Sequence, residues 1–253
     1  MYTPRQSEIL EVAKVSGLVT VEALVEKFGV TPQSIRKDLG ILSKGRLLER
    51  VHGGARLASM IDNVSYEARR AIAHKEKQAI GQAVANIIPS NASLFINIGT
   101  TNEAVAQALV RHKRLMVITN NFNVASILSP YRENQVFITA GKVRSSDGGI
   151  VGESTIDFIN QFQVDYAVIG ASAMNTNGDL LDFDIREVKV SQAIVSNAKH
   201  VILASDSTKQ ERAAPVRIGH ISNIDTFVTD RVRNSEFRKL LDGFDVVTTE
   251  TST

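Results

Sequence analysis

The chain has 253 residues, of which 43% are hydrophobic and 22% charged, so we expect one or two globular domains with a substantial core. It has no cysteine, which excludes disulfides, thiolate catalysis and cysteine-ligated zinc. No apolar run approaches the ~20 residues of a membrane span, and the first residues show no secretory signal pattern. We therefore predict a cytoplasmic protein with no membrane partner.

The net charge of +2 is unevenly distributed along the chain. Residues 1–60 contain nine Lys and Arg against six Asp and Glu, a net charge of +3, so residues 61–253 carry −1. Such a small excess is weak evidence for a polyanionic partner. Evidence for a polyanionic partner must therefore come from where the Lys and Arg residues lie on the first predicted helices, and not from their number.

Three short helices are predicted near the start of the chain. Apolar residues recur at helical spacing over residues 5–17, and a second helix runs from the candidate N-cap Thr20 to the candidate stop Gly29. A third start signal, Thr31 followed by Pro32, comes only two residues later. Two helices joined by so tight a turn are typical of a helix-turn-helix.

The third helix, over residues 32–45, has an apolar face and a basic face. Its apolar positions are Ile35, Leu39 and Leu42. On the basic face, Gln33 and Arg36 are candidates to read base edges, because glutamine can pair with adenine and arginine with guanine. Arg36 and Lys37 are alternatively candidates for phosphate contacts. A carboxylate repels phosphates, so we interpret Asp38 as holding a neighbouring cation.

An extended hairpin is predicted after the third helix, with a turn at residues 52–54 and a returning segment at residues 55–57. It predicts a basic wing that faces the DNA backbone or minor groove. The alternative is a small helical subdomain whose charged face is merely solvated. The candidate DNA-binding residues are Thr31, Gln33, Ser34, Arg36, Lys37, Arg50, His52 and Arg56.

The segment from SEILEV to VHGGA resembles the winged helix-turn-helix of DeoR-type transcriptional regulators. The signature core of that family is matched by TPQSIRKDL, with Ser34 in place of the usual threonine. A small hydroxyl is kept at that position. The resemblance implies that the first domain binds double-stranded operator DNA.

We place a linker at residues 58–75, between a DNA-binding domain at residues 1–57 and a second domain at residues 76–253. From about residue 78, apolar runs alternate with helical stretches. Continuous apolar strands separated by helices predict an α/β domain with a mostly parallel sheet covered on both faces. In such sheets, ligands gather at the carboxyl ends of the strands.

The predicted elements of the second domain alternate along the chain. Strands are predicted at residues 93–99, 115–120, 135–141, 165–172, 200–206, 225–230 and 245–250. Helices are predicted near residues 102–111, 122–129, 153–162, 185–198 and 234–242.

Small residues, hydroxyls, amides and cations collect at the ends of these strands. The Gly-Thr-Thr turn at residues 99–101 leads directly into a helix and would bind a phosphate at its N-terminus, while Lys209 would neutralise part of the phosphate charge. Such a set suits a small phosphorylated polyol or sugar. The candidate effector-binding residues are Gly99, Thr100, Thr101, Asn120, Asn121, Gly141, Arg144, Asp182 and Lys209.

Each of these features has a plain structural alternative. The Gly-Thr-Thr turn is also an ordinary helix start, Lys209 an ordinary surface lysine, and Asn120 and Asn121 a cap for the next helix. The acids within residues 182–187 either bind polyol hydroxyls or form a solvated loop before a helix. Their convergence on one sheet edge favours the functional interpretation for the set.

The second domain also resembles the effector domain of DeoR-type regulators, through LFINIGTTNEAVAQAL, RSSDGGIVGESTIDFINQF and SDSTK. That domain shares a fold with ribose-5-phosphate isomerases and coenzyme A transferases. One departure is Asn97, where the family more often carries Asp. The resemblance implies a homodimeric or homotetrameric repressor of glycerol or glycerol-3-phosphate catabolism genes. Its effector would be glycerol-3-phosphate or another sugar phosphate.

An enzyme is the alternative from a different class. Sugar-phosphate isomerisation needs a carboxylate base, yet the turn after the strand at residues 165–172 has no carboxylate before Asp179. A coenzyme A transferase needs a nucleophilic glutamate, but Glu153 better suits the start of a helix. The five histidines show no spacing for metal ligation. We therefore predict no catalytic residue, no cofactor and no metal site.

Overall fold

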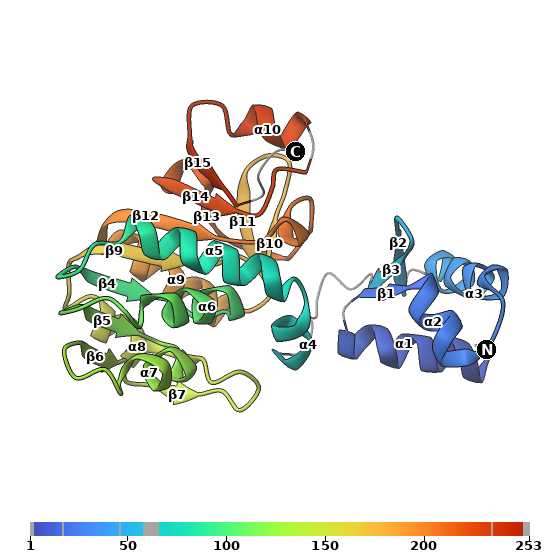
Figure 1. Ribbon diagram of the computed structural model, residues 1–253, viewed down its shortest axis with the longest axis horizontal. Coiled ribbons are helices and arrows are strands. Elements are labelled where there is room, and N and C mark those ends of the chain that lie inside the picture. The colour runs from blue at the N-terminus through green and yellow to red at the C-terminus, as the bar shows by residue number, and fades with distance from the viewer. Residues whose placement is uncertain (1–2, 17, 46, 58–65, 234, 250–253) are drawn as a thin grey trace. The chain divides into compact units, whose positions relative to one another are not determined.

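The computed structural model describes residues 3–16, 18–45, 47–57, 66–233 and 235–249 (Figure 1). It divides into two compact units, Met1–Ile72 and Ala73–Thr253. Residues 58–65 of the predicted linker lie outside the described residues. The remainder of that stretch forms helix α4 (Tyr66–Ala71) and the start of helix α5 (His74–Ile87).

The first unit combines helices with a three-stranded sheet of order β1-β3-β2. The predicted caps are confirmed, because the Thr20 hydroxyl accepts the N–H of Ala23, and Gly29 is left-handed with φ 62°. The predicted apolar face of α3 is confirmed as well, since Ile35 and Leu39 are fully buried. The elements before α4 are α1 (Pro4–Ser16), β1 (Leu18–Thr20), α2 (Val21–Phe28), α3 (Pro32–Lys44), β2 (Leu48–Val51) and β3 (Gly54–Leu57).

Strand β1 has no counterpart in the sequence prediction. It pairs antiparallel with β3, where Val19 lies opposite Ala55. A Cβ atom at Gly54 would lie 2.0 Å from the carbonyl oxygen of Val19, so only glycine permits this approach of the two backbones. Gly54 was predicted to lie in the hairpin turn, whereas the structure makes it the first residue of β3.

The second unit is built on a seven-stranded sheet of order β15-β14-β12-β9-β4-β5-β6, and every pair in it is parallel. The prediction of a mostly parallel α/β domain is confirmed. Because all strands run the same way, their carboxyl ends meet at one edge. The strands are β4 (Ser93–Ile96), β5 (Met116–Thr119), β6 (Gln135–Ile138), β9 (Val164–Ile169), β12 (Ala198–Ala204), β14 (Thr226–Thr229) and β15 (Asp245–Thr248).

Helices cover both faces of this sheet and enclose two apolar cores. One face packs against α5, α6 and α7, which lie in front of the sheet in Figure 1, and the other packs against α8, α9 and α10. No helix in the described part of the chain is long and apolar enough to span a membrane. The helices after α5 are α6 (Thr100–Leu109), α7 (Phe122–Leu128), α8 (Glu153–Ile159), α9 (Ile185–Ser196) and α10 (Ser235–Leu240).

Two glycines inside helices have different surroundings. A Cβ atom at Gly81 would lie 2.6 Å from the carbonyl oxygen of Ala104, so α5 and α6 meet backbone to backbone there. A Cβ atom at Gly40 in α3 would meet nothing within 4 Å. Glycine is therefore a packing requirement in α5 but not in α3.

Two small antiparallel sheets were not predicted from the sequence. One is the hairpin of β7 (Lys142–Val143) and β8 (Ile150–Val151), and the other has the order β10-β11-β13. The strands of the second are β10 (Ala173–Met174), β11 (Asp179–Asp182) and β13 (Val216–His220). Asp182, one of the acids for which hydroxyl binding and a solvated loop were the two alternatives, is the last residue of β11.

Candidate functional site

The exposed face of α3 carries Gln33, Arg36 and Lys37, as the helical spacing predicts. Among the described residues, neither Arg36 nor Lys37 has an ion-pair partner, so both charges face solvent. The hydroxyl of Thr31 accepts the N–H of Ser34 at 3.3 Å and lies 3.0 Å from the Ser34 hydroxyl. Thr31 and Ser34 therefore fix the start of α3, which presents the longer side chains beyond it.

Asp38 is buried beneath this face. Its carboxylate accepts hydrogen bonds from Arg5 Nε at 2.6 Å and from Gln6 Nε2 at 2.8 Å. The interpretation of Asp38 as an anchor for a cation is confirmed, although its partner comes from α1 rather than from its own helix. These two bonds hold α3 against α1.

The hairpin of β2 and β3 forms the wing, and its three basic residues differ in their contacts. Arg50 donates from Nη1 to the carbonyl oxygen of Arg36 at 3.2 Å, which connects the wing to α3. Arg56 pairs with Glu49 at 2.8 Å, so part of its charge is already neutralised. His52 is exposed in the turn between the strands.

In the second unit, the turn between β4 and α6 has the geometry expected of an anion site. Gly99 has φ 132° and ψ 144°, a conformation open to glycine, and gives α6 no side-chain cap. The helix begins at Thr100, two residues earlier than predicted. Its first backbone N–H groups therefore point toward the carboxyl edge of the sheet, where a phosphate would bind.

Asn102 is the most buried polar side chain of this turn. Its Nδ2 donates to the carbonyl oxygens of Asn97 at 3.1 Å and Ile98 at 3.0 Å. Its Oδ1 is buried and has no hydrogen-bond partner among the described residues. The end of β9 is close by, since a Cβ atom at Gly170 would lie 3.8 Å from Asn102 Nδ2. Sequence reasoning did not select Asn102.

The two asparagines after β5 have different surroundings. Asn121 caps α7, since its Oδ1 accepts the N–H groups of Asn123 and Val124, as the structural alternative predicted. Asn120 donates from Nδ2 to the carbonyl oxygen of Ile150 at 3.2 Å, and its buried Oδ1 has no partner among the described residues. Asn120 thus retains an acceptor for a ligand hydroxyl, whereas Asn121 is engaged in the fold.

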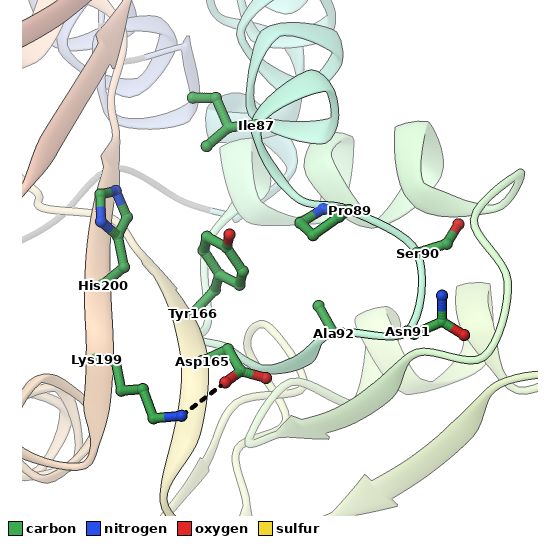
Figure 2. A pocket seen from close by; sticks show the side chains of 9 residues that line it. All are labelled: Ile87, Pro89, Ser90, Asn91, Ala92, Asp165, Tyr166, Lys199 and His200. Atoms are coloured by element: carbon green, nitrogen blue, oxygen red, sulfur yellow. Dashed lines mark hydrogen bonds and ion pairs between the residues drawn. The ribbon is translucent and has the colours of Figure 1, made fainter.

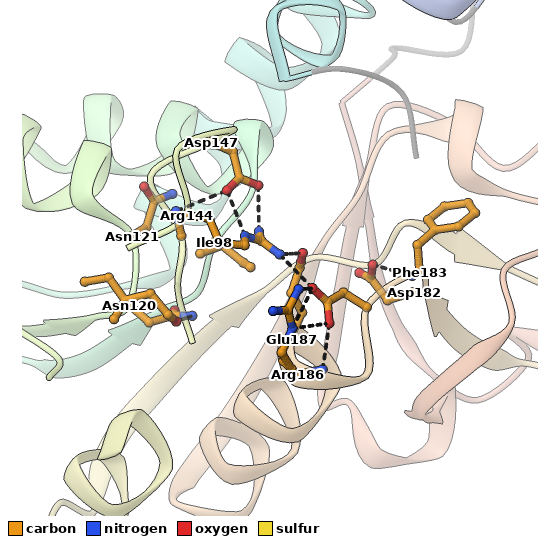
Figure 3. Close-up of polar contacts among 12 residues, drawn as sticks. Ile98, Asn120, Asn121, Arg144, Asp147, Asp182, Phe183, Arg186 and Glu187 are labelled. Carbon is orange, nitrogen blue, oxygen red and sulfur yellow. Dashed lines mark hydrogen bonds and ion pairs between the residues drawn. The ribbon is translucent and has the colours of Figure 1, made fainter. Parts of the chain in front are cut away.

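Arg144 lies at the centre of the site, among three carboxylates (Figure 3). Its Nη2 is 2.7 Å from Asp147 Oδ2, its Nη1 is 3.4 Å from Asp184 Oδ2, and Nη1 also contacts Glu187. The Arg144 side chain is only 13% exposed. Asp147 was not selected from the sequence, and the pairing of Arg144 with the residues of α9 joins segments about forty positions apart.

Burial and charge shift the pKa values of this cluster. Burial, followed by repulsion from Asp182, raises the pKa of Glu187 to about 7, against the lowering effect of Arg144. Burial lowers the pKa of the Arg144 guanidinium, but the carboxylates of Glu187 and Asp147 outweigh it and raise that pKa. Glu187 therefore exchanges a proton near neutral pH while Arg144 stays charged.

Asp182 repels Glu187, and a second arginine lies against the neighbouring Phe183. The Asp182 carboxylate is buried and accepts the N–H of Phe183 at 2.6 Å. The guanidinium of Arg212 lies 5.3 Å from the centre of the Phe183 ring and 3.4 Å from the carbonyl oxygen of Ser172. Arg212 was not selected from the sequence, where it is one cation in a polar loop.

Lys209 ends a short 3₁₀ turn, Ser207–Lys209, that follows β12. Asp230 holds this turn, since it accepts the Ser207 N–H at 2.6 Å and the Ser207 hydroxyl at 2.7 Å. Only β9 separates β12 from β4 in the sheet, so the strand ends before Lys209 and Gly99 are about 10 Å apart. Gly141 is required for packing, because a Cβ atom there would lie 2.4 Å from Thr155 Oγ1.

A hollow at the amino ends of the strands is shown in Figure 2. Asp165 accepts hydrogen bonds from the Ser93 hydroxyl at 2.7 Å and from Lys199 at 3.0 Å, which lower its pKa to about 2. His200 Nε2 lies 2.9 Å from the Thr226 hydroxyl. These polar groups pair with one another and connect strand ends, so the carboxyl edge is the better ligand site.

The geometry of the two units defines the class of protein: a helix-turn-helix with a wing precedes an α/β unit that has a charged site at the carboxyl ends of its strands. Two family models match the chain accordingly. The DeoR-like helix-turn-helix domain matches residues 5–60, and the DeoR C terminal sensor domain matches residues 72–231. The chain belongs to the DeoR family.

Curated relatives match this chain over nearly its whole length. It is 45% identical to the glycerol-3-phosphate regulon repressor of Escherichia coli over 90% of each chain. It is 42% identical to the glycerol-3-phosphate regulon repressor of Haemophilus influenzae, over 90% of this chain and 89% of that one. It is also 36% identical to the transcriptional repressor CsqR of Escherichia coli, over 90% of this chain and 88% of that one.

Among solved structures, the translation initiation factor eIF-2B of Pyrococcus horikoshii is similar in fold. It matches 89% of this chain and 94% of its own, with 14% identity and a TM-score of 0.52. A ribose 5 phosphate isomerase A from Neisseria gonorrhoeae matches 53% of this chain and 52% of its own, with 14% identity and a TM-score of 0.39. At 14% identity, the match to eIF-2B shows a similar fold and no more. The activity of this chain has to be argued from its own site residues.

Proposed function

We propose that this protein is a transcriptional repressor that acts in the cytoplasm and releases operator DNA when it binds glycerol-3-phosphate. The observation that carries the proposal is its 45% and 42% identity to two glycerol-3-phosphate regulon repressors across about nine-tenths of each chain. A match of 228 residues extends into both units, so the likeness is not confined to the DNA-binding unit or to the sensor.

The DNA-binding roles are divided between α3 and the wing. Gln33 and Arg36 read base edges from the first turns of α3, and Lys37 contacts phosphate. Arg50 and His52 face the DNA backbone beside α3. Thr31 and Ser34 act through the helix start, and Arg56, which is paired with Glu49, contributes least.

The effector binds at the carboxyl edge of the sheet. Its phosphate accepts hydrogen bonds from the start of α6 and takes the place of Glu187 on Arg144, while Asp147 keeps that guanidinium oriented. The unpartnered Oδ1 atoms of Asn102 and Asn120 accept hydrogen bonds from effector hydroxyls. Lys209 and Arg212 add positive charge at the end of β12.

Release follows from linkage between the two sites. The effector must bind the form of low operator affinity more tightly, and the coupling is reciprocal and typically about 1–3 kcal/mol. Repressors of this kind present two recognition helices to repeated half-sites. We therefore include a homo-oligomer in the proposal.

A sensor for another sugar phosphate is the closest alternative. Asn97, where the family more often has Asp, donates from Nδ2 to the Ser191 hydroxyl at 2.8 Å and accepts the N–H of Ile98. Its side chain thus shapes the turn before α6 without facing the ligand. The choice of effector depends on the hydroxyl acceptors around Arg144.

An isomerase is the second candidate, and one observation favours it. Glu187 is a buried carboxylate whose pKa of about 7 suits a general base. Its contact with Arg144 and the names of the relatives favour a binding role instead. Incubation with pentose and triose phosphates tests this alternative, and we expect no turnover.

The decisive experiment is a fluorescence-anisotropy titration with DNA from the protein's own upstream region, at one fixed salt concentration. We expect tight binding that glycerol-3-phosphate weakens and glycerol does not. Thr100→Ala and Lys209→Ala should keep operator binding but lose release. If a different phosphorylated compound releases the DNA, the proposed effector is wrong and that compound replaces it. If both variants still release DNA normally, the phosphate binds elsewhere in the protein.

A further inference from the structure

The two edge strands of the large sheet differ in the side chains that they expose. In β6, Phe137 is 37% exposed and Ile138 is 41% exposed. They are the only exposed large hydrophobic side chains within the described strands of this sheet. In β15, at the other edge, the exposed residues are Asp245 and Thr248. An apolar exposed edge favours pairing with another strand, and a charged one discourages it.

The backbone of β6 also has an unused side. Gln135 and Thr139 donate their N–H groups to β5, to the carbonyl oxygens of Leu115 and Thr119 at 2.8 and 3.0 Å. Successive residues of a strand point their backbone N–H and C=O groups to opposite sides. Since Gln135 and Thr139 face β5, the N–H and C=O groups of Val136 and Ile138 point away from it. The strand has no second partner in the described sheet.

We propose that β6 is a dimerisation edge, where two copies of this chain pair antiparallel about a two-fold axis through Phe137. Val136 of each copy then lies opposite Ile138 of the other, and the two pairs exchange four backbone hydrogen bonds. Phe137 meets its own equivalent in the intervening position, where side chains approach most closely. The two seven-stranded sheets become one continuous sheet.

Side chains on both faces of the edge fit this arrangement. The Phe137 ring lies 5.9 Å from that of Phe162, which lies 5.3 Å from that of Phe158, so an aromatic group extends to the edge on one face. Ile138 lies on the other face with Val136, which packs against the core beneath α7. A second copy would cover both faces of the exposed edge.

Charge favours a second copy over an unrelated partner. Residues 134–140, which are symmetric about Phe137, read NQVFITA and contain no charged side chain, so two-fold pairing over this stretch brings no like charges together. An isologous contact requires this self-compatibility. Strand β15, by contrast, begins with the exposed and charged Asp245.

Cross-linking tests the axis directly, because the natural chain contains no cysteine. Phe137→Cys places two thiols across the axis, where paired Cα atoms are about 4.5 Å apart, within the range that a disulfide spans. Thr248→Cys, on the opposite edge, is the matched control. We expect mild oxidation of the full-length protein to convert most of the Phe137→Cys chain, but not the control, to a covalent dimer on a non-reducing gel.

A charge variant gives a second measurement. Ile138→Lys should raise the dimer dissociation constant at least tenfold in sedimentation experiments, with the far-ultraviolet circular dichroism unchanged, whereas Thr248→Lys should leave it as in the natural chain. A monomeric natural chain, a dimer that survives Ile138→Lys, or cross-linking only through Thr248→Cys would each overturn the proposal. None of these readouts depends on the effector.

Discussion

Arg36 on α3 and Arg144 beside β7 are both proposed to contact the ligand of their unit, yet their surroundings differ. Arg36 is exposed and has no ion-pair partner among the described residues. Arg144 is 13% exposed and contacts three carboxylates. A DNA-binding cation needs only to reach a polyanion, whereas a sensor cation must exchange one partner for another. In the proposed mechanism, effector binding therefore rearranges the contacts of Arg144, whereas DNA binding requires no rearrangement at Arg36.

Removal of Arg144 should have the largest effect. Arg144→Ala leaves Asp147, Asp184 and Glu187 without their shared cation, so the free energy of unfolding should fall by about 3–5 kcal/mol. Urea denaturation measures this change. Arg186→Ala is the matched control, because Arg186 also pairs with Asp184 but is 60% exposed, so its loss should cost far less stability than the loss of Arg144. Equal losses in the two variants would contradict the buried cluster.

Removal of Arg36 should affect binding and not stability. Arg36→Ala should weaken operator binding by about 1–3 kcal/mol if the guanidinium reads a guanine, with unchanged thermal unfolding. Fluorescence anisotropy at fixed salt measures the loss. Lys44→Ala, at the far end of the same helix, should have a smaller effect. Unchanged operator affinity for Arg36→Ala would remove α3 as the recognition helix.

The pH dependence of effector binding sharpens the comparison. Burial raises the pKa of Glu187 to about 7, so in the proposed site its carboxylate becomes charged over this pH range and competes with phosphate for Arg144. Relative to Glu187→Gln, the natural chain should therefore bind the effector more weakly as pH rises from 6 to 8, by a few-fold. Isothermal titration calorimetry on both proteins separates the effect of Glu187 ionisation from that of the phosphate, because the phosphate ionises in the same way with either protein. Parallel pH profiles would exclude Glu187 as the competing group.

The raised pKa of Glu187 also makes the folded state less stable as pH rises. The pKa of Glu187 is higher in the folded chain than the ordinary value of 4.5, so the folded state binds the extra proton between about pH 4.5 and 7. The stabilisation from this proton is complete below that window and is lost as pH rises through it. Glu187→Gln should remove this part of the pH dependence of unfolding.

The smallest effect is expected in the wing. Arg56 is paired with Glu49, so Arg56→Ala should change operator affinity by less than about 0.5 kcal/mol. Arg50→Ala should cost more, since Arg50 joins the wing to α3 through the carbonyl oxygen of Arg36. Measuring operator affinity for both variants in one anisotropy series tests whether a wing arginine contributes more to DNA binding when it contacts α3. A larger loss for Arg56→Ala would reverse that assignment.

Local signals explain why much of the fold was predictable. Thr20, Gly29 and Thr31 mark helix ends through their own backbone preferences, and the apolar strands of the large sheet stand out because both faces are buried. Strands β1, β10 and β11 have only two to four residues, too few for an alternating pattern to stand out. Strand β10 pairs with its neighbour β11, whereas β1 pairs with β3, and β11 with β13, across more than thirty residues.

The site was less predictable than the fold. The Gly-Thr-Thr turn and Asn120 follow strands directly, so strand order alone brings them to one edge. The contact of Arg144 with Glu187 depends on how the β7–β8 hairpin folds over α9, and burial changes the chemistry of Glu187 only after that contact forms. A sequence shows charged residues in both segments but not which of them meet.

The two helical glycines, Gly40 and Gly81, set different limits on how this protein can be engineered. Replacing glycine by alanine inside a helix usually stabilises it by about 0.5–1 kcal/mol, and Gly40 has the free space for that change. The same swap at Gly81 would push α5 away from Ala104 and tilt α6, whose first turn forms the proposed phosphate site. The glycine-to-alanine route to a more stable chain is therefore open at Gly40 in the DNA-binding unit and closed at Gly81 in the sensor, where a methyl group has no room.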